Sequence, residues 1–269
     1  MNRKKRLRLQ IIIIAILAGI LVLSAAFAGF IAPNDPYATN AKAIRLAPCS
    51  EFIFGTDNLG RCVFSRILYG ARTTITATFT LVFISFVFGT FIGMICGYFG
   101  GFIDRFIMRI VDIVLAFPQM VIAIAVAGIL NVGLTGAMIA LGITMWTGFA
   151  RQARSHTYAI RNQPYIWVCH LAGKGNLYII LRHILPNLLW PLLTTALTQI
   201  GTTMIGISGL SFLGIGVVPP QAEWGSMINE ARAYIQLAPW AVLYPTLAMI
   251  ITITIFNLLG DKVMEYREA

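Results

Sequence analysis

Charged side chains are scarce in this sequence. Asp, Glu, Lys and Arg make up 11% of its 269 residues, whereas soluble domains carry roughly 25%. A soluble fold of this length still needs a polar surface, which so few charges do not supply. The composition therefore excludes a soluble domain, together with the disordered, collagen-like and nucleic-acid-binding classes. It predicts a multi-span membrane protein that has the lipid bilayer, and no nucleic acid, as a partner.

Motifs for catalysis and for cofactors are also missing. The chain has no G-x-x-x-x-G-K-[ST] to hold ATP phosphates, no G-x-S-x-G nucleophile turn and no H-E-x-x-H metal motif. We therefore expect no catalytic residue, no metal and no cofactor in this chain. If the protein moves a solute, the energy enters through other subunits.

Cysteines and histidines are few and form no recognisable site. None of the four cysteines belongs to a C-x-x-C pair, so no zinc or dithiol motif is indicated. Cys49 and Cys62 fall in one predicted outer segment, where a disulfide is conceivable but free thiols are favoured. The three histidines, His156, His170 and His183, favour ordinary polar contacts over a shared metal site.

Long apolar runs take the place of these motifs. A helix needs about 20 apolar residues to cross a bilayer, and the first run meets this requirement without a single charge. That run is longer than the apolar core of a signal peptide, so we expect an uncleaved first span. The six predicted spans are Gln10–Ile31, Thr73–Tyr98, Ile113–Leu130, Leu134–Ala150, Leu188–Leu213 and Trp240–Leu259.

The cations are unevenly divided between the segments that connect these spans. With a cytoplasmic N-terminus, most Lys and Arg residues fall on the inner side, while Asp and Glu are shared equally. This is the positive-inside pattern, and it predicts that both termini are cytoplasmic. Two large outer segments, residues 32–72 and 214–239, and one large inner segment, residues 151–187, lie between the spans.

Ionisable residues are almost absent from the predicted spans. Asp104, Arg105, Arg109 and Asp112 lie at the inner mouth of the third span. Arg109 and Asp112 are three residues apart on a helix and are expected to pair. A secondary transporter needs charges or broken helices within the membrane, and a membrane-embedded enzyme needs a catalytic constellation there. Neither is visible, so both classes are disfavoured.

The inner segment predicts a short apolar helix–turn–helix. Pro164 suits the first turn of a helix, and Tyr165–Ala172 is nearly all apolar. The glycines from Gly173 onward allow the chain to reverse, and a second helix over Leu177–Leu185 is expected to stop or kink at Pro186. An apolar helix on the cytoplasmic side favours a docking partner; burial against the protein's own spans is the alternative.

This segment resembles the cytoplasmic loop of permease subunits of binding-protein-dependent ABC importers. The family pattern is EAA, three residues, Gly, nine residues and then I-x-L-P. Here it reads Trp167-Val168-Cys169, then Gly173, then His183-Ile184-Leu185-Pro186. The spacing is kept, although WVC replaces EAA. His in the first Ile position resembles the dipeptide, oligopeptide and nickel branch of the family.

Other motifs of the same branch occur in the same order along the chain. They include GTDNLGR with SR (Gly55–Arg66), GYFGG (Gly97–Gly101), GLSFLGIG (Gly209–Gly216), EWG (Glu223–Gly225) and FNLLGD (Phe256–Asp261). Cys62 replaces the Asp that is usual in the first of them. Several independent motifs in one order make the resemblance specific.

The resemblance implies an all-α membrane protein with the MetI-like permease fold, six transmembrane helices and a location in the cell membrane. An N-terminal span and outer loop, residues 1–72, would precede a five-helix core, residues 73–269. The partners implied are a second homologous permease, two cytoplasmic ATPase subunits and an extracytoplasmic solute-binding protein. The inner segment would couple the permease to the ATPase through Tyr165, Trp167, Val168, Cys169, His170, Gly173, Leu185 and Pro186.

The substrate is less well defined, because in such importers the binding protein largely selects it. Nickel or a metal chelate is placed first, since Ala222–Arg232 looks closer to nickel permeases. Import of di- or oligopeptides is the alternative. Four outer residues are predicted to contact the binding protein or else to support the loop: Asp57, Arg61, Glu223 and Trp224.

Overall fold

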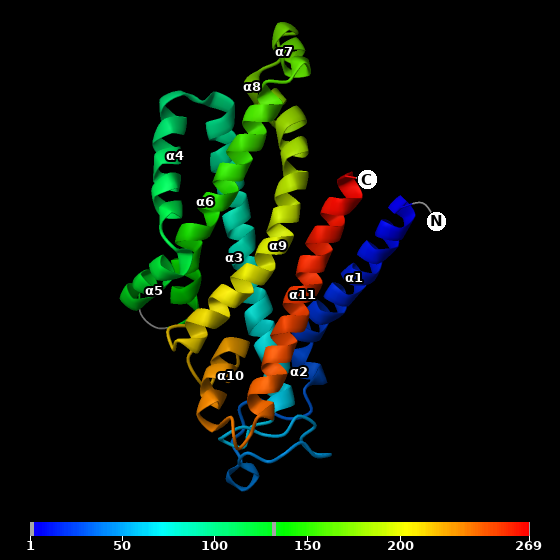
Figure 1. Cartoon of the computed structure of the whole chain (residues 1–269), viewed down its shortest axis with the longest axis vertical. Helices are drawn as coiled ribbons and strands as arrows, with labels where there is room; N and C mark the ends of the chain where they lie inside the picture. Colours follow the sequence, from blue (N-terminus) through cyan, green and yellow to red (C-terminus); the bar gives the residue numbers. More distant parts are fainter. Residues whose placement is uncertain (1–2, 131–132, 269) are drawn as a thin grey trace.

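The computed structural model describes residues 3–130 and 133–268, and helices joined by loops account for them (Figure 1). The five long helices are α1 (Arg3–Ala26), α3 (Val63–Phe99), α6 (Leu134–Arg161), α9 (Leu185–Phe212) and α11 (Trp240–Glu268). The shorter elements are α2 (Ala28–Ile31), η1 (Ala41–Ala43), α4 (Gly101–Ala116), α5 (Gln119–Leu130), α7 (Pro164–Leu171), α8 (Asn176–Ile179), η2 (Ile180–Ile184), α10 (Trp224–Ala231) and η3 (Arg232–Tyr234). The predicted all-α class is confirmed.

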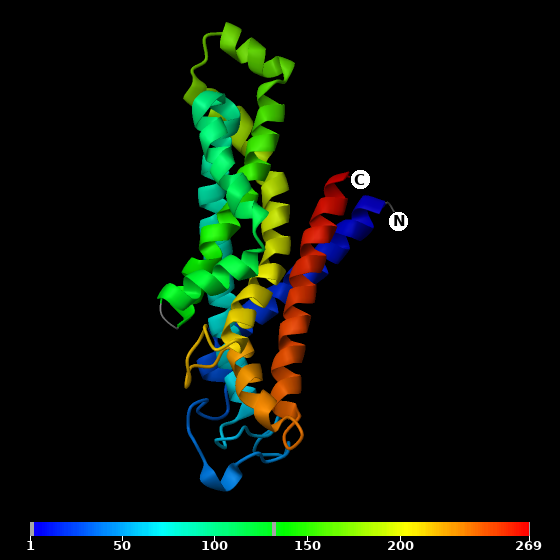
Figure 2. The ribbon, with the colours of Figure 1, turned by 60° about the vertical axis from the view of Figure 1, so that its left-hand side comes forward.

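The molecule is elongated, with α3, α6 and α9 packed along its length (Figures 1 and 2). α1 and α11 lie together on one side, and α4 and α5 lie on the other. One tip carries α7 and is called the α7 end; the opposite tip carries residues 32–62 and α10 and is called the loop end. The start of α1 and the end of α11 point toward the α7 end but stop well short of it (Figures 1 and 2), and Arg3 and Glu265 approach to 3.5 Å there. Both termini are therefore on the same side as the predicted coupling loop.

Small residues allow α3 and α6 to approach closely. Gly89, Gly93 and Gly97 recur every fourth residue on one face of α3, and they lie against α6 between Trp146 and Thr157. Contacts of this kind are typical of helix pairs in membranes, where small residues bring the backbones together. The main hydrophobic core extends from this contact to α9.

The six predicted spans are confirmed only in part. Among the described residues, four helices are long and apolar enough to cross a membrane: α1, α3, the continuous stretch Asn176–Phe212, and α11. The predicted span Leu134–Ala150 forms the first part of α6, which is not among those four helices. The first predicted span, Gln10–Ile31, is divided between α1, which begins at Arg3 and ends at Ala26, and the short α2. The proposed domain boundary after residue 72 lies within α3 and stays a prediction.

The third predicted span, Ile113–Leu130, is not one helix. α4 ends at Ala116 and α5 begins at Gln119, and the two helices are bent by 92°. Phe117 is extended, as a residue before proline prefers to be, and Pro118 lacks the N–H that would continue α4. The prediction of one continuous helix over Ile113–Leu130 is therefore wrong, although the bent pair can still form one broken span.

The predicted pair between Arg109 and Asp112 is also wrong. Asp112 instead pairs with Arg151 of α6 at 2.5 Å. About two turns earlier on α4, the Asp104 carboxylate accepts a hydrogen bond of 2.6 Å from Arg154 Nη2. These two ion pairs attach α4 to α6, so tertiary contact overrides the local spacing on α4.

Candidate functional site

The predicted boundaries of the exposed helix are confirmed. Gln163 is extended, and Pro164 occupies the first turn of α7, where its missing N–H leaves no helical bond unmade. α7 ends at Leu171. Gly173 follows with a φ of 73°, a left-handed conformation that glycine adopts without a steric penalty.

α7 exposes large apolar side chains at the tip of the molecule. Trp167 is 64% exposed and Leu171 is 88% exposed, whereas Ile166 is 1% exposed and belongs to the main core. Tyr165 and Val168 are exposed as well. One buried residue therefore anchors the helix while its neighbours present an apolar surface, which is typical of a protein–protein contact.

His183 on η2 connects α7 to the helix that follows. Its ring centroid lies 6.0 Å from that of Tyr165 and 5.8 Å from that of Tyr178. Its Nε2 atom lies 3.6 Å from the sulfur of Cys169. Cys169 is half-buried and faces this joint, whereas His170 beside it is exposed. Of the predicted coupling residues, Cys169 thus contributes to holding α7 in place.

Leu185 and Pro186 stand at the start of α9, and the helix does not stop or break there. Residues Asn176–Phe212 form one continuous helix. The turn before the proline, η2, is π-helical and holds an extra residue. We attribute the continuity to this wider turn, which leaves room for the proline ring that would clash in a regular helix. The segment after the α7 turn is therefore an extension of α9.

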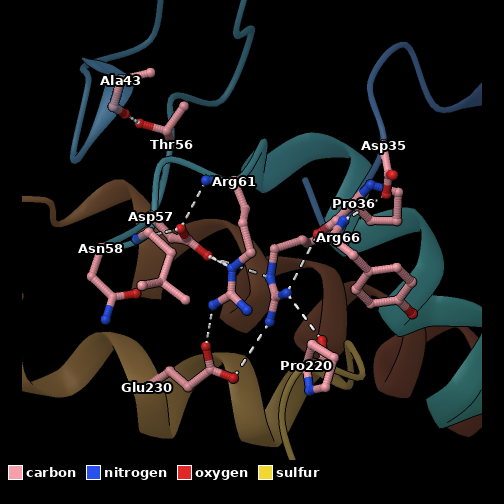
Figure 3. A network of polar contacts seen from close by, with 12 residues as sticks. Asp35, Pro36, Ala43, Thr56, Asp57, Asn58, Arg61, Arg66, Pro220 and Glu230 are labelled. Atoms are coloured by element: carbon pink, nitrogen blue, oxygen red, sulfur yellow. Dashed lines mark hydrogen bonds and ion pairs between the residues drawn. The ribbon is translucent and has the colours of Figure 1, made fainter. Parts of the chain in front are cut away.

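Four charged residues form a buried cluster at the loop end (Figure 3). The Arg61 guanidinium lies 2.6 Å from Asp57 and also pairs with Glu230. Arg66 of α3 lies 3.4 Å from Glu230 and 3.6 Å from Asp57. Both arginine side chains are 2% exposed. Two cations thus face two carboxylates, and the cluster joins the loop to α3 and α10.

Burial and charge oppose each other at Arg61. Burial has the largest single influence and lowers the pKa of the guanidinium, but Asp57 and Glu230 together outweigh it and hold the pKa above its ordinary value. Arg61 therefore stays charged. Because a buried charge without a partner is costly, the cluster is stable only as a complete set.

Glu223 and Trp224 hold three helices together beside this cluster. The Glu223 carboxylate accepts hydrogen bonds from Ser208 Oγ (2.7 Å), Thr74 Oγ1 (3.2 Å) and the Ser226 N–H (2.9 Å). The last of these caps the N-terminus of α10. The indole N–H of Trp224 donates to a backbone carbonyl of α3 at 3.1 Å. These bonds fix α10 against α3 and α9.

The structure buries all four residues that the sequence assigns to the binding protein or to the loop: Asp57, Arg61, Glu223 and Trp224. In this conformation they support the loop end from within, and contact with a binding protein stays a prediction. Sequence reasoning missed Glu230, which is 169 residues from Arg61 along the chain and belongs to no motif with it. It also missed Tyr178, whose ring contacts His183.

The described residues contain no group of three or more His, Cys, Asp or Glu side chains placed to hold a metal ion. Cys49 is exposed and Cys62 is buried, and the two thiols are not joined in a disulfide. The candidate site therefore has two parts: the exposed apolar helix α7 at one end, and the buried polar networks of Arg61 and Glu223 at the other.

The sequence matches the family described as "Binding-protein-dependent transport system inner membrane component" over residues 89–268. The chain belongs to this family. It is a permease of a binding-protein-dependent ABC importer and an inner-membrane component. Its apolar helices agree with a multi-pass membrane protein.

Named relatives show to which branch of the family this permease belongs. The dipeptide transport system permease protein DppC of Alkalihalophilus pseudofirmus is 40% identical over 240 residues, which is 89% of this chain and 79% of the relative. The glutathione transport system permease protein GsiD of Escherichia coli is 40% identical over 245 residues, which is 90% of this chain and 80% of the relative. The permease therefore belongs to the dipeptide and oligopeptide branch, as the motifs predict.

A solved structure supports the fold. A chain of the MetNI methionine ABC transporter, in inward-facing conformation, matches with a TM-score of 0.55 and 19% identity, over 71% of this permease and 94% of that chain. At this identity the likeness concerns the fold alone. The MetI-like architecture is thus confirmed.

The preference for nickel over peptides is not supported, because both relatives are named for peptide substrates. The structure explains why the motif misleads. Ala222–Arg232, which favoured nickel, forms α10 and its flanks, and Ala222, Glu223, Trp224 and Met227 are buried. Their identities are fixed by packing at the loop end, so they carry little information about a solute.

Proposed function

We propose that this permease forms part of the transmembrane path of an ATP-driven importer of short peptides. The observation that carries the proposal is 40% identity, over about nine-tenths of the chain, to permeases named for dipeptide and glutathione transport. Dipeptides and glutathione share a peptide bond and a free carboxylate. Short peptides are therefore the substrate class that both relatives have in common.

The proposed complex contains four kinds of subunit: this permease, a second homologous permease, two ATPases and a solute-binding protein. We place the α7 end in the cytoplasm, since most cations of the chain fall on that side. The loop end then faces the binding protein. Both termini lie on the α7 side and are cytoplasmic in this arrangement.

The exposed face of α7 is proposed to dock on the ATPase. Trp167 stands where the family pattern has glutamate, so polar docking is replaced by apolar burial. Full burial of such a side chain stabilises a contact by about 1.5–3 kcal/mol. An ATP-driven change requires contacts that differ between two states, and α7 supplies such contacts.

Movement of α7 passes to the spans through two connections. His183 joins α7 to the extension of α9. Tyr98, near the end of α3, donates a hydrogen bond of 2.9 Å to Asn176 at the start of α8. The ends of α3 and α9 are thus attached to the docking helix, while the loop end is held by the Arg61 and Glu223 networks.

The proposal is tested by uptake into proteoliposomes that contain the complete complex, with the purified binding protein outside. Labelled dipeptides are compared with labelled nickel, free and chelated, with and without ATP. We expect ATP-dependent peptide uptake with which nickel does not compete. ATP-dependent nickel uptake without peptide uptake would overturn the substrate class. Uptake by the permease alone, without ATP or partners, would instead indicate a secondary transporter.

A further inference from the structure

An open cavity of about 540 Å³ with both apolar and polar walls lies at the loop end, between residues 69–80 of α3 and the start of α6. Its wall on α3 includes Arg72, Thr76 and Thr80, which are spaced four residues apart and share one helix face. Tyr37 and Gln221 contribute from the loops. Its volume lies within the range of roughly 300–1,000 Å³ that small-molecule sites occupy.

Arg72 is the only charged side chain among the described residues that line this cavity. It is exposed, and no carboxylate of the described chain lies within ion-pair distance of it. The neighbouring Arg61 and Arg66 differ, because both are buried and paired with Asp57 and Glu230. Arg72 therefore presents an unpaired guanidinium to the cavity.

Two threonines extend the polar part of this cavity wall along α3. Thr76 and Thr80 are exposed, and they continue the polar surface from Arg72 into the span. The distance from residue 72 to residue 80 along a helix is roughly 12 Å. Polar side chains at this depth normally face a protein interior or a water-filled cavity. The cavity thus extends from the loop end along the first turns of the predicted span.

We propose that this cavity binds the carboxylate terminus of a short peptide during import, with Arg72 as the residue that recognises the carboxylate. A guanidinium forms two parallel hydrogen bonds with a carboxylate, and these are stronger than neutral ones. The hydroxyl groups of Tyr37 and Thr76 are suited to the peptide amide. No acidic residue lines the described part of the cavity to bind an ammonium group, so selection acts on the carboxylate. This inference rests on the proposed peptide import.

The test uses the complete complex in proteoliposomes and one dipeptide in two forms, the free acid and the C-terminal amide, each at a concentration that saturates the purified binding protein. The variants are Arg72→Gln and Arg72→Lys. Lys42→Gln serves as a control, because it removes an exposed positive charge from the same end of the molecule. Since the binding protein is unchanged, a difference between variants arises in the permease.

Arg72→Gln is expected to lower uptake of the free acid roughly tenfold and to leave uptake of the amide unchanged. Arg72→Lys keeps the charge but loses the paired hydrogen bonds, so its uptake of the free acid should fall between that of Arg72→Gln and that of the wild type. Lys42→Gln should behave like the wild type. ATPase activity stimulated by the binding protein should persist in all three, which shows that the complex is folded and coupled.

Equal uptake by Arg72→Gln and wild type would overturn the inference while the proposed peptide import stands. An equal loss for acid and amide would overturn it as well. If that equal loss also removed a dependence on anionic lipid, the cavity would hold a lipid headgroup. A wild-type complex that moves no peptide would instead contradict the proposed function itself.

Discussion

Gly93 of α3 lies directly against the backbone carbonyl oxygen of Ala150 on α6. A Cβ atom at position 93 would overlap this oxygen and would lie 2.8 Å from the Cβ atom of Ala153. Because one obstacle is backbone, the two helices must separate to admit a methyl group. We expect Gly93→Ala to lower the free energy of unfolding by about 1–3 kcal/mol, the usual effect of overpacking.

Thermal unfolding of the purified permease in detergent measures this effect. Gly148→Ala is the matched control, because it adds the same methyl group to α6 at a position with open space around it. The control should unfold at the wild-type temperature or slightly above it, since alanine favours the helix. Equal stability of the two variants would show that the α3–α6 contact is looser than the structure has it.

Glu230 provides the second carboxylate of the buried cluster at the loop end. Glu230→Gln leaves Arg61 and Arg66 with Asp57 as their only carboxylate in the cluster, so a buried positive charge loses its partner. Because the Glu230 side chain is 18% exposed, we expect destabilisation of about 3 kcal/mol, at the lower end of the range for a broken buried pair.

Chemical denaturation of the permease compares this variant with Glu265→Gln. Glu265 forms more exposed ion pairs with Lys262 and Arg3, which are worth about 0–1 kcal/mol. A loss in Glu230→Gln no larger than that in Glu265→Gln would contradict the idea that the cluster locks the loop end.

The limits of α7 could be predicted from the sequence, because they depend on local chemistry. Pro164 fits only the first turn of a helix, and Gly173 adopts a backbone conformation that other residues avoid. The long helices could be predicted for a similar reason, since the length of an apolar run fixes the length of a span. Hydropathy does not report where a helix bends, however. The same reasoning therefore predicted one straight span across Pro118, where the chain bends between α4 and α5.

Contacts between distant residues could not be predicted in this way. Spacing on α4 suggested Arg109 as the partner of Asp112, yet Arg151 on α6 pairs with it. Glu230 shares no motif with Arg61, and only the fold brings them together. Glu223 is buried because Ser208 of α9 and Thr74 of α3 pack against its carboxylate and donate hydrogen bonds to it. The sequence alone could not show whether Glu223 faces a partner protein or the interior.

Tyr234 makes the stability of the permease depend on pH in the alkaline range. Burial is the main cause that raises the pKa of its hydroxyl to about 12, and the Asp57 carboxylate adds to it. The unfolded chain, with a tyrosine pKa of about 10, therefore loses this proton first as the pH rises. The stabilisation is present below pH 10 and is lost toward pH 12. Unfolding should become easier over this window by on the order of 2 kcal/mol, and a Tyr234→Phe variant with the same pH slope as wild type would refute this.

Trp167 is the most distinctive residue of the docking surface. Trp167→Ala should uncouple the permease from its ATPase, because it removes the largest side chain of the exposed α7 face. It should leave the stability of the permease unchanged, since the side chain is 64% exposed. ATP hydrolysis stimulated by the binding protein, measured in the complete complex, should fall severalfold. Leu237→Ala, which shortens an equally exposed apolar side chain at the opposite end, should have little effect.

Replacement of EAA by WVC in the coupling loop leads to a prediction about partner choice. A groove that accepts a glutamate leaves its polar groups unpaired when a tryptophan enters, and such mismatches reduce affinity strongly. The permease should therefore require ATPases whose grooves are apolar where Trp167 docks. Complexes assembled with ATPases from a related importer that keeps the EAA triplet should show little ATP hydrolysis stimulated by the binding protein and little peptide uptake. Trp167→Glu, which restores the acidic residue, should improve coupling to those ATPases and weaken it to the native ones. Full uptake by the wild-type permease with the foreign ATPases would show that Trp167 does not determine the partner.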